Sequence, residues 1–269
     1  MSFATENFKD ERPLKTIGRI KDILHGLGLL PVETVWRNSL RDFFSVTVKI
    51  TGTDLAANGK GVSPEYALAS AYGEMMERLQ NQCTFRLSFD LSPAALASQG
   101  FYYAPDEKFL SRAEFLHSGE EWTAAQLARL DGTADVDGLL ALWQRMSYEE
   151  VPADFVALPY CNLRTGNISH IPVKMASKMY MSNGMCAGNT PEEALVQGIA
   201  EVFERHVNQR VVREKVVPPA VPDEYLARYP RIAAMVAAIK ASGDCDLIVK
   251  DCSLGRGFPV AAAVYIDRG

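Results

Sequence analysis

Apolar and polar residues alternate along the chain in stretches that predict both helices and strands. Between Arg12 and Leu30 the apolar side chains recur at helical spacing, and the pattern stops at Gly28, as is typical of a helix end. Phe43–Ile50 is rich in aromatic and β-branched residues, which favours a strand. A serine cap at Ser63 followed by proline opens a second helix, which is expected to run to about Asn81.

The same succession returns later in the sequence. A strand pair is expected at Phe155–Leu158 and Ser169–Val173, and a further helix begins with Thr190 and the proline behind it. The remaining expected elements are a helix at Arg231–Lys240 and strands at Leu247–Lys250 and Phe258–Ile266. Because strands and helices are mixed in both halves, the sequence predicts an α+β fold.

Glycines mark predicted turns and loops ahead of both capped helices. Asn58-Gly59-Lys60-Gly61 predicts a glycine-rich turn, and its letters do not form the G-x4-G-K-[ST] phosphate-binding loop. Ser182–Asn189 predicts a second glycine-bearing loop. The segment from Leu91 to Glu150 is acidic and irregular, with Thr123–Leu130 as its one expected helix. Pro218-Pro219 is expected to start a linker.

Composition and charge are those of a globular protein and narrow its partners. The chain is 48% hydrophobic and 23% charged, and its formal net charge of −5 argues against nucleic acid as a partner. No run of eighteen apolar residues is present, so no membrane span is expected, and the stretch up to Arg12 lacks the apolar core of a signal peptide. Five cysteines without a CxxC pair indicate free thiols rather than a zinc cage, which predicts a cytoplasmic protein.

The most informative feature of the sequence is a gapless internal repeat. Residues 61–82 read GVSPEYALASAYGEMMERLQNQ, and residues 188–209, at a shift of 127 positions, read GNTPEEALVQGIAEVFERHVNQ. Ten of the 22 paired positions are identical, and they include a proline, both glutamates of an E-x-x-E-R run and its arginine. So many matches without a gap indicate a duplication.

Each copy places a row of polar side chains on one face of its helix, because the residues are spaced by four and three positions. The two rows are Ser70, Glu74 and Glu77, and Gln197, Glu201 and Glu204. Carboxylates brought together by such a pair of helices would repel unless cations lie among them. Magnesium prefers oxygen ligands and commonly shares phosphate oxygens with one or two carboxylates. The repeat therefore predicts a magnesium-nucleotide held between the two helices.

A solvated helix face is the simpler explanation of a single E-x-x-E-R run, since such runs usually form local ion pairs. Solvated faces change freely, however, whereas here the caps, the small residues and the charges are kept in both copies. The duplication therefore favours a functional pair of helices.

At these residues the chain resembles the YcaO family of ATP-dependent enzymes that activate amides. The family's first ATP motif, S-x3-E-x2-E-R, is matched in full by Ser70, Glu74, Glu77 and Arg78. The second motif, S-x6-E-x3-Q, is matched by Glu193 and Gln197, with Cys186 in place of its serine. An E-x2-E-R run follows at Glu201, Glu204 and Arg205. The resemblance spans most of the chain, and the motifs occur in the family's order.

The resemblance implies that ATP and magnesium bind between two pseudo-equivalent αβ halves, expected at about residues 40–90 and 155–215. Carried over residue by residue, it implies that magnesium is held by Glu74, Glu77, Glu201 and Glu204. The implied nucleotide contacts are Lys9, Ser70, Arg78, Cys186, Asn189, Glu193, Gln197 and Arg205. No catalytic residue is implied.

The family relation also implies a reaction and partners. Family members phosphorylate a backbone amide oxygen of a peptide, after which a nucleophile adds to the activated carbon. One branch instead supports β-methylthiolation of a ribosomal protein as an accessory factor. The implied partners are therefore a peptide or ribosomal protein substrate and a methylthiotransferase, and family members commonly form homodimers.

Two departures from the family pattern affect these expectations. Cys186 lacks the hydroxyl contact of the family's serine, since sulfur is a weak hydrogen-bond acceptor. The family's C-terminal segment is also absent, and the chain ends at Asp267-Arg268-Gly269, which resembles a hairpin turn. The chain is therefore expected to be truncated at its C-terminus, to bind ATP weakly and to be inactive by itself.

Other functions stay open on the sequence alone. The chain could be a non-catalytic adaptor whose nucleotide site regulates docking of a partner, or a phosphotransferase acting on small molecules. Cys186 lies near a helix N-terminus, which could lower its pKa and make it a nucleophile, although no obvious base lies beside it. His206 follows the E-x-x-E-R run, but a lone helical histidine is more often packed or solvated than functional.

Overall fold

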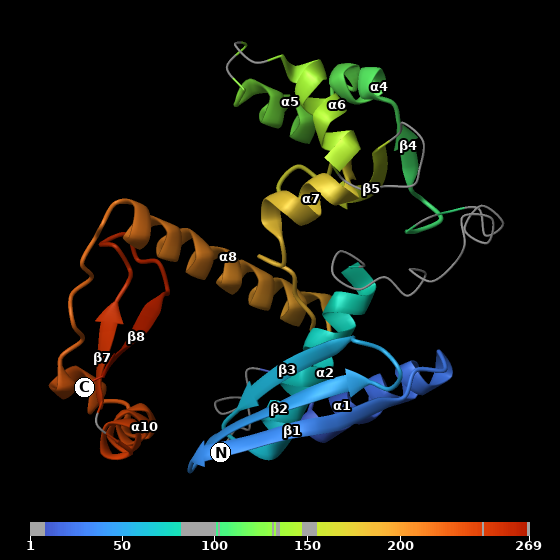
Figure 1. Ribbon diagram of the computed structural model, residues 1–269. Coiled ribbons are helices and arrows are strands. Elements are labelled where there is room, and N and C mark those ends of the chain that lie inside the picture. The colour runs from blue at the N-terminus through green and yellow to red at the C-terminus, as the bar shows by residue number, and fades with distance from the viewer. Residues whose placement is uncertain are drawn as a thin grey trace. The chain divides into compact units, whose positions relative to one another are not determined.

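A computed structural model describes residues 9–81, 101, 103–130, 132, 135–146, 155–243 and 245–267. The chain divides into two compact units. One unit is formed by Met1–Gln80 together with Asn183–Gly269, and the other by Asn81–Ser182. The mixture of helices and strands expected from the sequence is confirmed (Figure 1).

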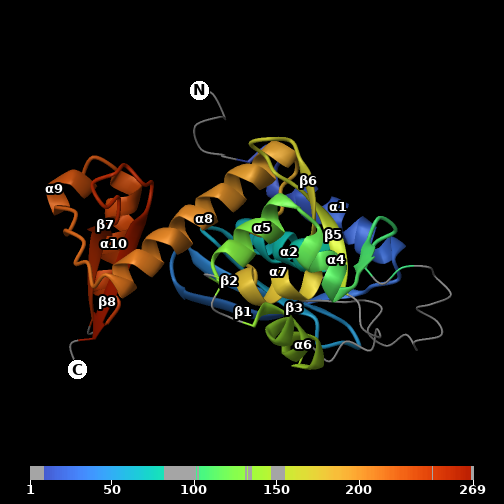
Figure 2. The same ribbon diagram turned by 90° about the horizontal axis from the view of Figure 1, so that it is seen from above.

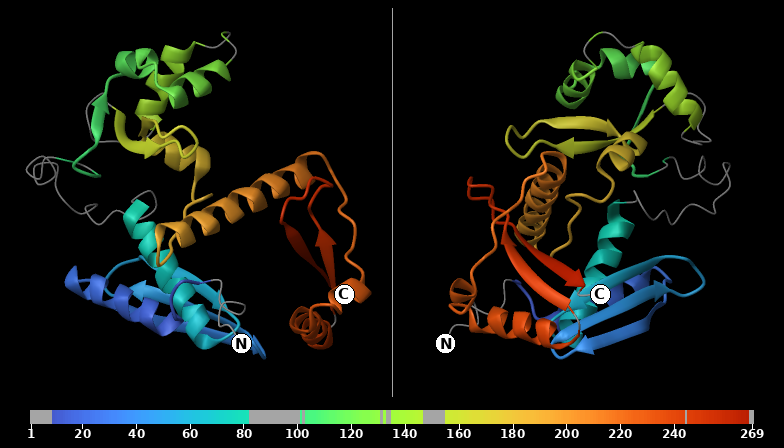
Figure 3. Two further views of the ribbon diagram at one scale, coloured as in Figure 1. Left: turned by 180° about the vertical axis from the view of Figure 1, so that it is seen from behind. Right: turned by 60° about the vertical axis from the view of Figure 1, so that its left-hand side comes forward.

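The first unit begins with two helices and a three-stranded antiparallel sheet of order β1-β2-β3. Its elements are α1 (Pro13–Gly26), β1 (Pro31–Leu40), β2 (Phe43–Ile50), β3 (Ala56–Gly61) and α2 (Pro64–Asn81). Both helices lie on the same side of the sheet (Figures 1 and 3). The predicted strand Phe43–Ile50 and the predicted extent of α2 are confirmed, whereas β1 was not predicted.

The core of this part forms where the sheet meets the two helices. Alternate residues of β2, Val46, Val48 and Ile50, are at most 1% exposed, as expected for a strand with one covered face. α1 contributes Leu24 and α2 contributes Met75, both fully buried. Burial of the apolar face of α2 leaves its polar row on the opposite side, which positions the candidate site.

The predicted turn at Asn58-Gly59-Lys60-Gly61 is wrong, because these residues lie inside strand β3. The glycines instead allow the strand to approach α2 closely. A Cβ atom on Gly59 would lie 1.9 Å from the carbonyl oxygen of Ala67, and one on Gly61 would lie 2.3 Å from the Ala67 nitrogen. Any side chain at these positions would overlap the backbone of α2.

The repeat seen in the sequence is also a repeat of local structure. α8 (Pro191–Arg213) begins after Gly188, where a Cβ atom would lie 2.4 Å from the Ala194 nitrogen. Gly188 and Ala194 correspond to Gly61 and Ala67 in the first copy, so both copies use the same close approach ahead of the helix. The Thr190 hydroxyl caps α8 by accepting the backbone N–H of Glu193 at 3.2 Å.

The rest of the first unit follows α8. It comprises α9 (Asp223–Leu226), α10 (Pro230–Ala241), β7 (Cys245–Asp251) and β8 (Ala261–Asp267). β7 and β8 pair antiparallel and lie with α10 at the C-terminal end of α8, away from α2 (Figures 1 and 2). The predicted helix and the two predicted strands of this region are confirmed.

The second unit contains an antiparallel sheet of order β4-β5-β6 and four helices among the residues that the structure describes. Its elements are β4 (Lys108–Leu110), α4 (Arg112–His117), α5 (Glu121–Ala128), α6 (Val136–Met146), β5 (Phe155–Cys161), β6 (Ile168–Pro172) and α7 (Val173–Tyr180). Its core gathers Phe115, Leu140, Phe155 and Met175. The strand pair β5–β6 was predicted, but the irregular segment before it contains β4, α4 and α6 as well as the one expected helix, and α7 was also missed.

Some sequence predictions fall on residues outside the described ranges. These are Cys83, parts of the segment from Leu91 to Glu150 (residues 91–100, 102, 131, 133–134 and 147–150), and the hairpin turn expected at Arg268-Gly269. Across the part of the chain that is described, no helix combines the length and the apolar character needed to cross a membrane.

Candidate functional site

The polar row of α2 is organised around one arginine. The guanidinium of Arg78 lies 3.3 Å from a carboxylate oxygen of Glu74 and 3.6 Å from one of Glu77. The side chain of Glu77 is 14% exposed and that of Arg78 is 19% exposed, whereas Ser70 is exposed. Arg78 lies four positions after Glu74 and directly after Glu77, and its side chain reaches both carboxylates.

The polar row of α8 repeats half of this arrangement. Arg205 lies 3.3 Å from Glu201, the same separation as in the corresponding pair Arg78–Glu74. The Glu201 side chain is 18% exposed, and Gln197 and Glu204 are exposed. The structure thus places an arginine-bound carboxylate at the same position of each repeated helix.

The two rows are close enough to influence each other electrostatically. The N-terminal half of α8 lies beside α2 (Figures 1 and 3). Burial raises the pKa of Glu77, and the negative charges of Glu74 and Glu201 raise it further against the lowering effect of Arg78. Glu201 belongs to the other copy, so carboxylates of both helices share one region.

Cys186 lies in the loop that leads into α8 and faces the same carboxylates. Burial raises the pKa of the Cys186 thiol, and the charges of Glu77 and Glu201 raise it as well, outweighing the opposite effect of the Gly198 backbone. The idea that the helix N-terminus lowers this pKa is therefore wrong. The thiolate is the nucleophilic form of cysteine, so a raised pKa argues against Cys186 as a nucleophile.

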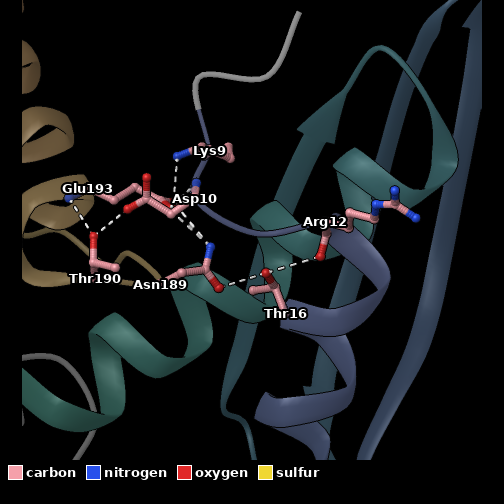
Figure 4. Close-up of polar contacts among 7 residues, drawn as sticks. All are labelled: Lys9, Asp10, Arg12, Thr16, Asn189, Thr190 and Glu193. Carbon is pink, nitrogen blue, oxygen red and sulfur yellow. Dashed lines mark hydrogen bonds and ion pairs between the residues drawn. The ribbon is translucent and has the colours of Figure 1, made fainter. Parts of the chain in front are cut away.

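A second cluster forms at the start of α8, where the N-terminal segment of the chain meets Glu193 (Figure 4). The Glu193 side chain is 7% exposed, and its carboxylate lies 3.3 Å from the Lys9 ammonium. It accepts the backbone N–H of Asp10 at 3.0 Å and the side-chain amide of Asn189 at 3.1 Å. Three residues implied by the family resemblance, Lys9, Asn189 and Glu193, are thus brought together.

The sequence missed three members of this cluster. The Thr16 hydroxyl of α1 donates to the Asn189 side-chain oxygen at 2.7 Å, and the Thr190 hydroxyl donates to the Asp10 carboxylate. Asp10 and Thr190 adjoin predicted site residues and could have been found in that way. Thr16 gives no signal, because it lies 173 positions from its partner.

These contacts predict a pH-dependent contribution of Glu193 to stability. Although burial raises the pKa of Glu193, the hydrogen bonds from Asp10 and Asn189 and the charge of Lys9 lower it on balance. A carboxyl whose pKa is lowered in the folded state stabilises that state above its unfolded pKa of about 4.3, and the effect is lost as pH falls through the folded value. We expect Glu193→Gln to lower the free energy of unfolding by about 1–3 kcal/mol at pH 7.

Urea unfolding between pH 7 and pH 3 checks this expectation. The difference between the parent chain and Glu193→Gln should narrow below about pH 4, as the parent's carboxylate becomes protonated. Glu192→Gln is the matched control, because Glu192 is the exposed neighbour on the same helix turn. A constant difference at all pH values, or equal losses in the two variants, would contradict the assignment.

His206, which the sequence left open as a candidate, has a packing role. The His206 ring packs against Phe258 with ring centroids 5.5 Å apart, and Phe203 contacts the same ring at 5.6 Å. His206 is therefore part of the contact between α8 and the segment ahead of β8, as the packed alternative predicted.

The carboxylates of α2 and α8 fit a magnesium site that a ligand would complete. Within the described ranges, no three His, Cys, Asp or Glu side chains form a group able to hold a metal ion. Magnesium does not need such a cage, since one or two carboxylates with phosphate oxygens and water suffice. Burial raises the pKa of Glu77, and the charges of Glu74 and Glu201 add to that rise, so a cation bound here would favour the ionised carboxylate.

Two copies of one acid-bearing helix, each preceded by a glycine in close contact with its backbone, define the class of this protein. The chain belongs to the YcaO family: the sequence model of that family, described as YcaO cyclodehydratase, ATP- and Mg2+-binding, matches residues 58–269. The resemblance drawn from the motifs is therefore confirmed.

Two curated relatives match nearly the whole chain. It is 33% identical over 261 residues to the Escherichia coli protein named ribosomal protein S12 methylthiotransferase accessory factor YcaO. It is 32% identical over 262 residues to an uncharacterised protein of Haemophilus influenzae. Each match covers 96% of this chain but 44% of the relative, so the chain spans less than half the length of these relatives.

Two solved structures share the fold. A YcaO protein from Methanopyrus kandleri, described as bound with AMPPCP and Mg2+, matches 91% of this chain and 55% of its own length, with a TM-score of 0.51. A heterocyclase, described as in complex with substrate and cofactor, matches 98% of this chain and 36% of its own, with a TM-score of 0.58. Both are 17% identical to this chain, which supports the fold alone.

Proposed function

We propose that the chain binds a magnesium-nucleotide between α2 and the N-terminal half of α8. One observation carries the proposal: the N-terminal half of α8 lies beside α2, so carboxylates of both copies share one region, where burial and then the charges of Glu74 and Glu201 raise the pKa of Glu77. Like charges that two copies of a helix hold near each other need a cation, and magnesium bound to phosphate supplies one. The YcaO protein from Methanopyrus kandleri is bound with such a pair of ligands, AMPPCP and Mg2+.

The residues of the proposed site have two roles, binding of magnesium and contact with the nucleotide. Magnesium would be held by Glu74, Glu77, Glu201 and Glu204. The nucleotide would be contacted by Lys9, Ser70, Arg78, Cys186, Asn189, Glu193, Gln197 and Arg205. Arg78 pairs with Glu74 and Glu77, and Arg205 pairs with Glu201. A guanidinium can also donate two parallel hydrogen bonds to phosphate.

The proposed activity is ATP-dependent activation of a peptide backbone amide. ATP bound with magnesium would transfer its γ-phosphoryl group to the amide oxygen and be released as ADP. The oxygen could then leave as phosphate after a nucleophile adds to the amide carbon. The chain itself positions the phosphates by its cations and backbone donors, and its carboxylates fix the metal, so catalysis rests on orientation and charge rather than on a side-chain nucleophile. The raised pKa of the Cys186 thiol agrees with a site that uses no side-chain nucleophile.

A second candidate is an accessory role in modification of a ribosomal protein, which the name of the Escherichia coli relative favours. In that role the nucleotide site would regulate or stabilise docking of a methylthiotransferase, and the protein would be an adaptor. Either role places the protein in the cytoplasm, and we propose a homodimer as in other family members.

Phosphate release by the full-length protein separates the two roles. An enzyme should release phosphate from ATP at least about tenfold faster when ribosomal protein or a candidate peptide is added. An adaptor should bind ATP without added turnover and should capture a methylthiotransferase in a pull-down that depends on nucleotide. A protein that shows neither nucleotide binding nor phosphate release would overturn the proposed function.

A further inference from the structure

Gly198 lies in the first half of α8, where its lack of a side chain leaves space for Cys186. A Cβ atom on Gly198 would lie 2.9 Å from the Cys186 sulfur and 3.0 Å from the carbonyl oxygen of Gly184. Gly198 is buried although its neighbours Gln197 and Ile199 are exposed. The loop before α8 therefore rests on the helix at a point where only glycine fits.

The first copy of the repeat has the corresponding contact between its helix and the segment ahead of it, but there the smaller residue of the pair is on that segment rather than on the helix. At the shift of 127 positions, Gly198 corresponds to Ala71 and Cys186 corresponds to Gly59. In the first copy the glycine is on the incoming strand, where a Cβ atom on Gly59 would lie 2.8 Å from the Cβ of Ala71. In the second copy the glycine is on the helix, and the side chain is on the incoming loop. The total size of the pair is limited in both copies.

The contact also sets where the loop lies along α8. Gly184 has a φ of +81°, and a Cβ atom there would lie 3.1 Å from Val202, one turn further along the helix. The loop is thus seated at two successive turns of α8, on Gly198 and on Val202. Glu201 follows Gly198 by three positions on α8, so the seat lies within one helix turn of that carboxylate.

We propose that Gly198 is a positioning residue, whose missing side chain seats Cys186 and its loop at the carboxylates of α2 and α8. The inference deepens the proposed nucleotide site, on which it rests for its effect on binding. An added methyl group at Gly198 would push the sulfur and the Gly184 carbonyl away from the helix, because both would lie at or below the closest distance that a Cβ tolerates. The loop that carries the implied nucleotide contacts Cys186 and Asn189 would move with them.

Gly198→Ala, Cys186→Ala and the double variant test the proposal. Gly198→Ala should increase the rate at which N-ethylmaleimide labels Cys186, as measured by mass mapping of the peptides. The same variant should weaken magnesium-ATP binding about tenfold. The double variant removes the overlapping sulfur, so its affinity should return to within about threefold of Cys186→Ala alone. Gly73→Ala is the matched control, because a Cβ on Gly73 meets nothing within 4 Å in the interior of α2.

The outcomes separate this inference from the proposed function. If the parent chain binds no nucleotide, the proposed function fails, and faster labelling of Cys186 in Gly198→Ala still supports the seating. If Gly198→Ala leaves labelling and binding as in the parent, the seating is wrong. Weakened binding that the double variant does not recover at all would mean that space for the Cys186 sulfur is not what Gly198 provides, and would also overturn the inference.

Discussion

Glu77→Ala and Glu204→Ala are each expected to remove most of the chain's affinity for magnesium-ATP, a loss of at least about tenfold or 1.4 kcal/mol. Glu77 is the most enclosed of the four acidic candidates, and Glu204 is its counterpart at the same position of the repeat. Removing either carboxylate leaves the metal with fewer oxygen ligands and reduces the negative charge that attracts it. Calorimetric titration with magnesium-ATP measures the change.

Stability and binding should move in opposite directions for Glu77. A carboxyl whose pKa is raised on folding destabilises the folded state while it is ionised, and this cost disappears as pH falls through the folded pKa. Glu77→Gln should therefore bind magnesium-ATP poorly at pH 7.5 and yet unfold at a urea concentration no lower than the parent. A mutant damaged in its fold would lose both properties.

The matched control for the binding prediction is Glu214→Ala. Glu214 ends the same helix as Glu204 and pairs with Arg210 at 2.8 Å, at the end of α8 away from α2. Its removal should leave affinity unchanged, since surface pairs of this type contribute little. Parent-like affinity in both Glu77→Ala and Glu204→Ala would end the assignment of the metal site.

Gly59→Ala is expected to lower the free energy of unfolding by about 3 kcal/mol or more, a large effect for the addition of one methyl group. Its Cβ would lie 1.9 Å from the Ala67 carbonyl oxygen and 2.3 Å from the Ala71 nitrogen, both backbone atoms that cannot turn aside. β3 and α2 would have to separate, which would open the core above Val46 and Val48. Urea unfolding followed by circular dichroism measures the change.

Gly73→Ala is the comparison variant, for which the free energy of unfolding should rise instead of fall. The position is inside α2 and a Cβ there contacts nothing within 4 Å, so the variant should gain about 0.5–1 kcal/mol from higher helix propensity. The two variants make the same chemical change 14 residues apart in the sequence. If Gly59→Ala is as stable as Gly73→Ala, strand β3 does not approach α2 as described.

Local signals in the sequence predict the helices that carry the site. Caps at Ser63 and Thr190 with a proline at the next position determine where α2 and α8 begin, because they satisfy backbone N–H groups at that point. The short helix α4 was missed although Ser111 and Glu114 form a capping box, since six residues give too little periodicity to recognise. β1 was missed because it is largely exposed and lacks an alternating apolar face.

Contacts between distant residues were beyond prediction from spacing alone. The glycines of β3 indicate a turn when read locally, and only the packed helix shows why glycine is required there. Lys9 and Glu193 became candidates through the family resemblance, since no periodicity relates positions so far apart. The repeat, in contrast, could be recognised from the sequence. Its two copies align without a gap, so they imply two matching helices even when the contacts of those helices are unknown.

The pairing of Glu193 with the N-terminal segment has a consequence for synthesis of the protein. Asp10 and Glu193 are 183 positions apart, so a ribosome adding roughly 5–20 residues per second makes the second partner about 10–40 seconds after the first. During that interval α1, the β1–β3 sheet and α2 have all their mutual contacts available, because these close over short stretches of chain. The start of α8 therefore docks late, onto an N-terminal segment and a scaffold that can already be in place when α8 leaves the exit tunnel.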